Sequence, residues 1–190
     1  MKNFADPIAL LGTSADPPTY GHKSLLEGLI KIFPSVVTWA SDNPLKSHGA
    51  PLSVRHRLLE ELVTTIANPK IKLIQEISSP RTVKTLEKAT SIWPNKELIF
   101  VIGSDLAEEL PHWKEVQYLL SKVRVGIAPR KGWPVNQSQL NRLESLGGKI
   151  ELLSLEIPAT SSTEVRDQMQ FKNIPKPVLQ LIENYKLYGM

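Results

Sequence analysis

Short apolar runs rich in β-branched residues alternate along the chain with longer stretches whose apolar residues recur at helical spacing. The runs cover residues 8–11, 36–40, 71–74, 98–102, 123–128 and 150–153. Leu25, Leu26, Leu29, Ile30 and Phe33 mark the apolar face of a first helix, and further helices are predicted over 53–67, 82–92, 112–121, 137–146, 162–170 and 175–185. Strands that alternate with helices in this way pair in parallel, because each helix returns the chain to the same end of the sheet.

This order predicts an α/β fold with a doubly wound, mostly parallel sheet of about five to six strands and helices on both faces, as in Rossmann-like proteins. We expect a single domain over residues 1–190, because no repeat, low-complexity stretch or linker divides the chain. Residues 158–190 would form its C-terminal helical part. In such a sheet a ligand binds beyond the carboxyl ends of the strands, where strand order reverses, so the residues after each strand are the first candidates for a site.

The composition excludes several kinds of site and partner. The chain of 190 residues has no cysteine, which excludes disulfides, thiolate zinc sites and cysteine nucleophiles and fits a reducing compartment. Asp6 and Pro7 stand where a signal peptide needs its apolar core, and no apolar run approaches the ~20 residues of a membrane span. We therefore expect a cytoplasmic protein with no membrane partner. The net charge is +4, but the basic residues are scattered, which favours a small phosphorylated ligand over nucleic acid.

The loop after the first strand has the features of a phosphate site. It reads Gly-Thr-Ser-Ala-Asp-Pro-Pro-Thr-Tyr-Gly-His over residues 12–22 and leads into the first helix. Gly12 and Gly21 would let a ligand approach the backbone, the helix start offers free N–H groups, and His22 can add a directed donor. An isolated histidine would more often cap or pack at a helix start, but the surrounding loop favours phosphate binding.

Residues Thr19-Tyr20-Gly21-His22 resemble the T/H-x-G-H signature of nucleotidyltransferases built on a Rossmann-like fold, and they lie in the required place between a strand and a helix. Other segments narrow the resemblance to the bacterial nicotinate-nucleotide adenylyltransferases. Residues 41–46 are similar to that family's Pro-Pro-His-Lys/Arg loop, residues 102–105 and 110–113 to its Ile-Gly-x-Asp and Leu-Pro-x-Trp motifs, and residues 160–166 to its Ile-Ser-Ser-Thr-x-Ile-Arg motif. Residues 184–188 resemble its terminal helix.

The resemblance implies transfer of AMP from ATP to nicotinate mononucleotide, which gives nicotinate adenine dinucleotide and pyrophosphate in NAD biosynthesis. The 5′-phosphate of the mononucleotide would attack the α-phosphorus of ATP in line, without a covalent intermediate, because this nucleophile is already an anion. No group of residues has the spacing of a protein metal site, so Mg²⁺ is expected to arrive with ATP. The sequence leaves open whether the chain forms a homo-oligomer.

The same resemblance assigns roles to the candidate residues. The catalytic residues would be His22 and Thr19 on the ATP phosphates, Lys46 as a mobile charge and Arg166 as a fork for phosphate oxygens. The ATP-binding residues would be Gly12, Thr13, Ser14, Gly21, Gly103, Asp105, Arg130, Ser161, Ser162 and Thr163. The mononucleotide-binding residues would be Asp16, Arg81, Thr82 and Trp113, with the Trp113 indole stacked on the nicotinate ring.

Plainer roles stay open for five of these segments. They are a helix N-cap for Asp105, an N-cap with a solvated arginine for residues 161–166, a core position for Trp113, ordinary loop polarity for Thr82 and a solvated charge for Arg130.

Three positions depart from the family pattern. Thr19 stands in place of its commoner first histidine, Leu45 in place of a loop histidine, and Arg81 in place of an aromatic residue. Arg81 could pair with the nicotinate carboxylate and sharpen the preference for the acid over the amide. A threonine at position 19 is familiar in the phosphopantetheine adenylyltransferases. That activity, a nicotinamide mononucleotide adenylyltransferase and an inactive nucleotide-binding sensor are the alternatives.

Overall fold

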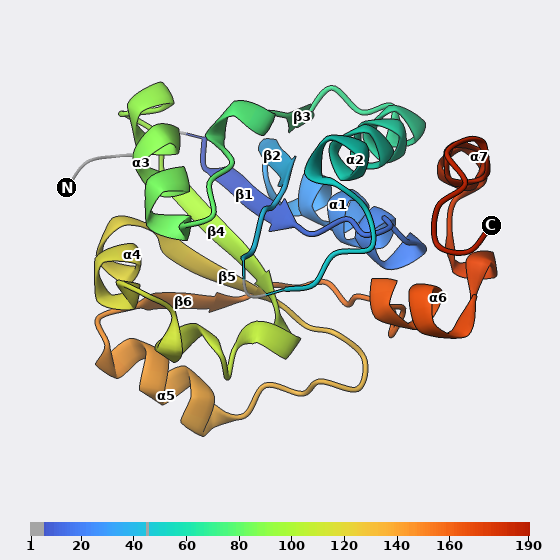
Figure 1. Cartoon of the computed structure of the whole chain (residues 1–190). Coiled ribbons are helices and arrows are strands. Elements are labelled where there is room, and N and C mark those ends of the chain that lie inside the picture. Colours follow the sequence, from blue (N-terminus) through green and yellow to red (C-terminus); the bar gives the residue numbers. More distant parts are fainter. Residues whose placement is uncertain (1–5, 45) are drawn as a thin grey trace.

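The computed structural model describes residues 6–44 and 46–190, and within them one sheet of six parallel strands crosses the molecule (Figure 1). The strands are β1 (Ile8–Thr13), β2 (Ser35–Ala40), β3 (Ile71–Leu73), β4 (Leu98–Gly103), β5 (Arg124–Ala128) and β6 (Lys149–Leu152). Their order is β3-β2-β1-β4-β5-β6, and every neighbouring pair is parallel. The doubly wound α/β fold and its six predicted strands are confirmed.

Helices connect the strands and follow the last of them. They are α1 (Tyr20–Ile32), α2 (Leu52–Ile66), α3 (Thr82–Ile92), α4 (Val116–Lys122), α5 (Gln137–Ser145), α6 (Ser162–Gln168) and α7 (Lys176–Asn184). Short 3-10 turns form η1 (Gln75–Ile77), η2 (Ser104–Leu106), η3 (Leu110–His112) and η4 (Phe171–Asn173). In the described part of the chain, none of these helices has the length and apolarity that a bilayer crossing requires.

The helix predicted over 112–121 begins later than expected. Leu110–His112 form η3, Trp113 is extended with φ −66° and ψ 144°, and Glu115 has φ 59°. Pro111 suits the first turn of η3, because that position needs no N–H donor. The chain then changes direction before α4 starts at Val116. Trp113 therefore lies in the connection that follows β4 rather than on a face of α4.

Apolar residues cover both faces of the sheet, as expected for parallel strands between two layers of helices. Ala9 and Leu11 of β1 belong to the core formed with α1, α2 and α7, whereas Ile8 and Leu10 belong to the core formed with α3, α4 and α5. Successive side chains of a strand point to opposite faces, so β1 contributes to both cores. Figure 1 shows α3, α4 and α5 on one side of the sheet and α1, α2, α6 and α7 on the other.

Strand order reverses at β1, which lies between β2 and β4. Gly12 and Thr13 end β1, and Gly103 ends β4, at the same edge of the sheet. The loops that follow β1, β4 and β5 leave from this edge, which is where a doubly wound sheet binds its ligands.

Candidate active site

Two helix starts meet beyond the carboxyl end of β1. The hydroxyl of Ser162, at the start of α6, donates a hydrogen bond of 2.8 Å to the carbonyl of Pro17 in the loop before α1. Thr160 lies against Gly21 so closely that a Cβ at Gly21 would be 2.6 Å from its Oγ1. The sequence suggested that Gly21 admits a ligand. The structure gives this glycine a packing reason, because any side chain would separate the two helix starts, and contact of its backbone with ATP stays a prediction.

Thr19 and His22 lie at the start of α1 and fix the orientation of the imidazole. The backbone N–H of Thr19 donates to Nδ1 of His22 over 3.1 Å, and Thr19 Oγ1 lies 3.0 Å from the same nitrogen. Because Nδ1 accepts from a backbone N–H, the proton of the neutral imidazole resides on Nε2. No hydrogen bond from Nε2 to another protein atom occurs among residues 6–44 and 46–190, which leaves it as a directed donor.

The imidazole of His22 is kept neutral by its surroundings. Burial is the largest cause that lowers the pKa of His22 from 6.5 to about 4; Arg130 lowers it further, and Asp105 opposes the change. At neutral pH His22 is therefore an uncharged hydrogen-bond donor rather than a cation.

Arg130 joins the ends of β4 and β5 to the start of α6. Its Nη1 donates to Oδ2 of Asp105 over 2.9 Å, and its Nη2 donates to the carbonyl of Thr160 over 3.0 Å. The backbone N–H of Arg130 also donates to the hydroxyl of Ser104 over 2.9 Å. Arg130 is thus held by η2 and by the segment before α6, and it is not a solvated surface charge. Asp105 lies inside η2, whose N-cap is Gly103, so it does not cap that turn.

Ser161 takes the N-cap role at α6 that the sequence allowed. Its hydroxyl accepts from the N–H of Glu164 over 3.0 Å, and the Glu164 carboxylate accepts from the N–H of Ser161 over 3.1 Å. This reciprocal pair is a capping box. The N–H groups of Ser162 and Thr163 lie in the first turn, where no intrahelical carbonyl is available to them, so they can still serve a ligand.

Arg166 lies over the first loop, but its nearest acceptor is protein. Its Nη1 donates to the backbone carbonyl of Asp16 and lies 3.5 Å from Oδ2 of the same residue. Its Nε and Nη2 make no hydrogen bond to the protein within the described ranges, so two of its donor groups are open to a ligand. Asp16, expected to bind the mononucleotide, is only 1% exposed, which makes direct contact with a ligand difficult.

Lys46 is exposed in the connection between β2 and α2, and its backbone N–H donates to the carbonyl of Asn43 over 3.1 Å. Its exposure is compatible with a charge that moves to the phosphates, and that role of Lys46 stays a prediction. Leu45, the departure from the family pattern in this loop, lies outside the described residues.

The residues expected to bind the mononucleotide base lie on the side of the sheet covered by α3 and α4. Arg81 is the exposed N-cap of α3, and Thr82 is its first residue. The indole of Trp113 meets the ring of Phe100 edge to face, with centroids 6.2 Å apart and planes at 79°. Trp113 therefore packs partly on the core, and its remaining surface is accessible.

Gly12 faces an indole rather than open space. A Cβ at Gly12 would lie 2.7 Å from the buried ring of Trp39, its neighbour in the parallel register of β2. The close approach thus serves packing at the strand end. Thr13 orders the loop locally, because its hydroxyl accepts from the N–H of Ala15 over 3.2 Å.

Arg55 of α2 is a site residue that the sequence reading missed. It is 1% exposed, and it donates to three backbone carbonyls: those of Ser14 and Ser41 over 2.7 Å each and that of Ala50 over 3.0 Å. Burial lowers the pKa of Arg55, and the charges of Asp16 and Asp42 oppose this change. One buried guanidinium therefore ties the loop after β1 to the loop after β2. The only pattern in the sequence that could have indicated Arg55 is a charged residue on the buried face of the amphipathic helix α2.

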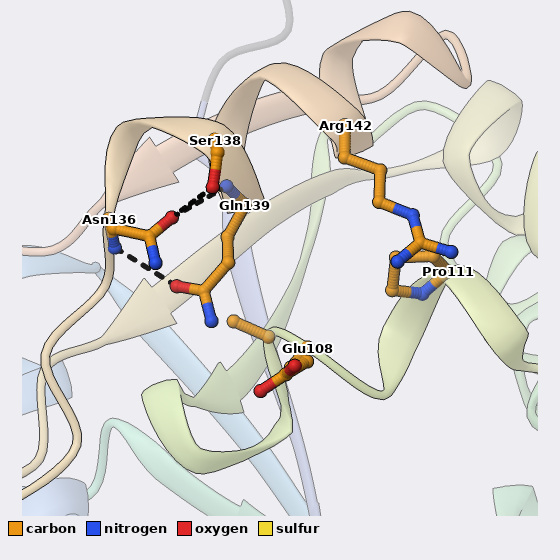
Figure 2. A pocket seen from close by; sticks show the side chains of 7 residues that line it. Glu108, Pro111, Asn136, Ser138, Gln139 and Arg142 are labelled. Carbon is orange, nitrogen blue, oxygen red and sulfur yellow. Dashed lines mark hydrogen bonds between the residues drawn. The ribbon is translucent and has the colours of Figure 1, made fainter.

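A separate hollow lies beside the connection that follows β4, and Figure 2 shows the side chains that line it. It is lined by Ala107, Glu108, Pro111, Asn136, Ser138, Gln139 and Arg142. Asn136 and Gln139 bond each other in the capping box of α5, so these polar groups serve the helix start. None of the predicted site residues lines this hollow. Within the described ranges no group of three or more His, Asp or Glu residues could hold a metal ion.

The chain matches the cytidylyltransferase-like family over residues 10–168. It is 34% identical over 196 residues to a probable nicotinate-nucleotide adenylyltransferase of Synechocystis sp., and the match covers 95% of this chain and 98% of the relative. A probable nicotinate-nucleotide adenylyltransferase of Rhodopirellula baltica is 27% identical over 204 residues, with 95% and 92% covered.

The fold is similar to that of solved structures. One is Plasmodium falciparum nicotinic acid mononucleotide adenylyltransferase complexed with NaAD, with a TM-score of 0.77, 24% identity and coverage of 97% of this chain and 98% of the other. Another is a putative nicotinate-nucleotide adenylyltransferase from Vibrio parahaemolyticus, with a TM-score of 0.67, 20% identity and coverage of 97% and 96%. At these identities the likeness concerns the fold.

Proposed function

The chain belongs to the cytidylyltransferase-like family and, within it, to the nicotinate-nucleotide adenylyltransferases, and from this premise we propose how it joins its two substrates. The reaction transfers AMP from ATP to nicotinate mononucleotide. A bond forms between a 5′-phosphate oxygen of the mononucleotide and the α-phosphorus of ATP, and the bond from that phosphorus to pyrophosphate breaks. The product is nicotinate adenine dinucleotide, an intermediate of NAD biosynthesis.

The observation that carries the proposal is the contact between the starts of α1 and α6. The hydroxyl of Ser162 donates to the carbonyl of Pro17 over 2.8 Å, so the N–H groups of α6 open beside the loop that leads into α1 and His22. Two helix starts that share one space provide N–H donors and positive dipole ends for adjacent phosphate groups. The same contact supports treating residues 158–190 as part of one domain with the rest of the chain.

Catalysis here requires alignment and charge stabilisation rather than a base. The attacking phosphate is already an anion, and pyrophosphate is a stable leaving group, so the protein's task is to hold both and to stabilise the charge that develops between them. His22 suits this task because Nε2–H is a preoriented neutral donor. The free Nε and Nη2 of Arg166 and the mobile ammonium group of Lys46 supply positive charge.

The remaining residues would hold the two nucleosides. Gly103 and Asp105 at the end of β4 lie at the edge where the ribose of ATP would sit, with Arg130 bracing Asp105 over 2.9 Å. Thr82 and Arg81 at the start of α3 would meet the nicotinate carboxylate, and Trp113 would stack on the ring.

A divalent cation fits this site only when it is bound to ATP. The family's chemistry implies one, yet the described residues offer no cluster of ligands, and the carboxylate of Asp105 is bonded to Arg130. We propose that Mg²⁺ would enter with ATP, held by the triphosphate rather than by protein side chains, and would supply positive charge against that of the leaving pyrophosphate.

The direct test is a pyrophosphate-release assay with ATP, Mg²⁺ and one acceptor at a time. We expect turnover with nicotinate mononucleotide and a lower kcat/KM with nicotinamide mononucleotide. Preferred turnover with phosphopantetheine would replace the proposed acceptor. Binding of ATP without turnover of any acceptor would indicate a nucleotide sensor.

A further inference from the structure

The buried carboxylate of Asp16 lies at the centre of a polar cluster whose members come from distant parts of the chain. Oδ1 accepts a hydrogen bond of 2.7 Å from the hydroxyl of Tyr188, and Oδ2 accepts one of 2.7 Å from the N–H of Gly49. Nη1 of Arg166 lies 3.5 Å from Oδ2, and Nδ1 of His48 lies 3.6 Å from it. Both carboxylate oxygens are thus committed to protein donors, so Asp16 organises the site rather than binding substrate.

We propose that Tyr188 is a positioning residue, which through Asp16 sets the place of Arg166 and of the loop that carries Lys46. This inference deepens the proposed function and rests on it, because Arg166 and Lys46 are the cations assigned there to the phosphates. Tyr188 itself touches neither phosphate in this scheme: its hydroxyl acts through Asp16, and its ring packs against Gly49.

The packing of three segments around Gly49 supports this role of Tyr188. A Cβ on Gly49 would lie 2.9 Å from Cδ of Arg166 and 2.9 Å from Cε1 of Tyr188. The Gly49 backbone therefore runs between the two side chains without room for a methyl group. A shift of the Tyr188 ring would therefore displace both the Arg166 side chain and the backbone at Gly49.

The second support is the anchoring of the chain end that carries Tyr188. Val178 and Ile182 of α7 are buried in the core shared with α1 and α2. Beyond α7 the chain turns back through left-handed conformations at Lys186 (φ 51°) and Tyr188 (φ 56°), which side chains rarely adopt unless contacts hold them. The tail thus has a fixed path from a buried helix to the carboxylate of Asp16.

The third support is electrostatic. Burial, together with the hydrogen bond to Asp16, raises the pKa of Tyr188 above its ordinary value, so its hydroxyl remains a donor at every physiological pH. A buried carboxylate needs donors on both oxygens. Without the Tyr188 hydroxyl, Oδ1 of Asp16 would lose its short bond, and the carboxylate would be free to turn toward Arg166 or water.

The test is Tyr188→Phe, which keeps the ring against Gly49 and removes only the hydroxyl. We expect kcat to fall about tenfold or more at a temperature where the variant is fully folded, with KM for ATP changed less than about threefold. Tyr118→Phe, an exposed tyrosine on α4, is the matched control and should keep wild-type kcat. A lower melting temperature with unchanged kcat would overturn the proposal, because a purely structural role predicts that result.

A combined variant tests the route through Arg166 and Lys46. If Tyr188 acts through these two cations, adding Tyr188→Phe to a variant that carries both Arg166→Ala and Lys46→Ala should lower kcat less than about twofold further, whereas an independent role of Tyr188 predicts that the losses multiply. Multiplying losses would overturn the proposal.

Amide hydrogen exchange separates this inference from the proposed function, because it requires no turnover. In Tyr188→Phe the amide of Gly49 should exchange about tenfold faster or more, while amides of β4 keep wild-type rates. Unchanged exchange at Gly49 would overturn the positioning role even if the enzyme is active. An inactive wild type with faster exchange at Gly49 in the variant would contradict the proposed function alone.

Discussion

The backbone N–H of Thr19 donates a hydrogen bond to Nδ1 of His22 over 3.1 Å, and this contact decides which side of the imidazole faces a ligand. It assigns the proton to Nε2, which makes no hydrogen bond to another residue in the described part of the chain. A threonine in place of the commoner histidine at position 19 keeps this arrangement, because the backbone N–H donates whichever side chain stands there.

Loss of the His22 donor should therefore slow the chemistry without unfolding the protein. We expect His22→Ala to lower kcat in the pyrophosphate-release assay by at least ~10²-fold, the scale for removal of a preorganised transition-state donor. His112→Ala is a control, because His112 is exposed and bonds Arg142 instead. Wild-type kcat in His22→Ala would remove His22 from the mechanism.

The lowered pKa of His22 predicts the sign of a pH effect on stability. In the unfolded chain the imidazole takes up a proton near pH 6.5, whereas in the folded protein it does so only near pH 4. Between these values the unfolded state binds more protons, so the free energy of unfolding falls as pH is lowered from about 7 toward 4.

Urea unfolding at pH 7.5 and pH 5 would measure this effect. Wild type should lose roughly 2 kcal/mol more than His22→Gln over that interval. In wild type, the NMR titration of His22 should have its midpoint well below 6. A midpoint near 6.5 would show that burial does not govern this group.

Arg55 should matter for stability more than any exposed arginine. Arg55→Met leaves three carbonyls without their donor, and we expect the free energy of unfolding to drop by about 3–5 kcal/mol. Arg57→Met, on the same helix but exposed and paired with Glu60, should leave it close to the wild-type value, because exposed ion pairs contribute little to stability. Chemical denaturation of both variants gives their free energies of unfolding. Equal small decreases in the two variants would mean that water replaces the Arg55 guanidinium.

Loss of the Trp113 side chain should weaken binding of nicotinate mononucleotide and leave binding of ATP unchanged. If its indole stacks on nicotinate, Trp113→Ala should raise KM for nicotinate mononucleotide roughly tenfold and leave KM for ATP within about twofold, since stacking on one ring contributes about 1–3 kcal/mol. Initial rates under saturating ATP, then under saturating mononucleotide, provide the two values. An equal rise in both KM values would indicate that loss of the Phe100 contact disturbs the whole connection after β4.

The Arg81 side chain should set the preference of the enzyme for nicotinate mononucleotide over nicotinamide mononucleotide. With its guanidinium removed in Arg81→Ala, the ratio of kcat/KM for nicotinate over nicotinamide mononucleotide should fall about tenfold, as for loss of one charged hydrogen bond. Lys84→Ala, one turn further along α3 and paired with Glu87, should leave the ratio unchanged. An unchanged ratio in Arg81→Ala would mean that another group reads the carboxylate.

Features set by local patterns could be predicted from the sequence. The six strands and the bounds of α3 follow from apolar periodicity, which acts over a few residues. The capping role of Ser161 follows in the same way, because its partner Glu164 is three residues away. The start of α4 could not be predicted, because its helical pattern continues through residues whose backbone turns at Glu115.

The sequence by itself determined the alternation of strands and helices, and with it the edge of the sheet at which His22 and the start of α6 would meet. Only the tertiary structure decided that Gly12 and Gly21 make room for Trp39 and Thr160, because the space around a glycine depends on distant neighbours. It also decided that Asp16 is bound by Tyr188, 172 positions along the chain. Such contacts carry no local periodicity, because a buried carboxylate takes whichever donors the packed chain brings to it.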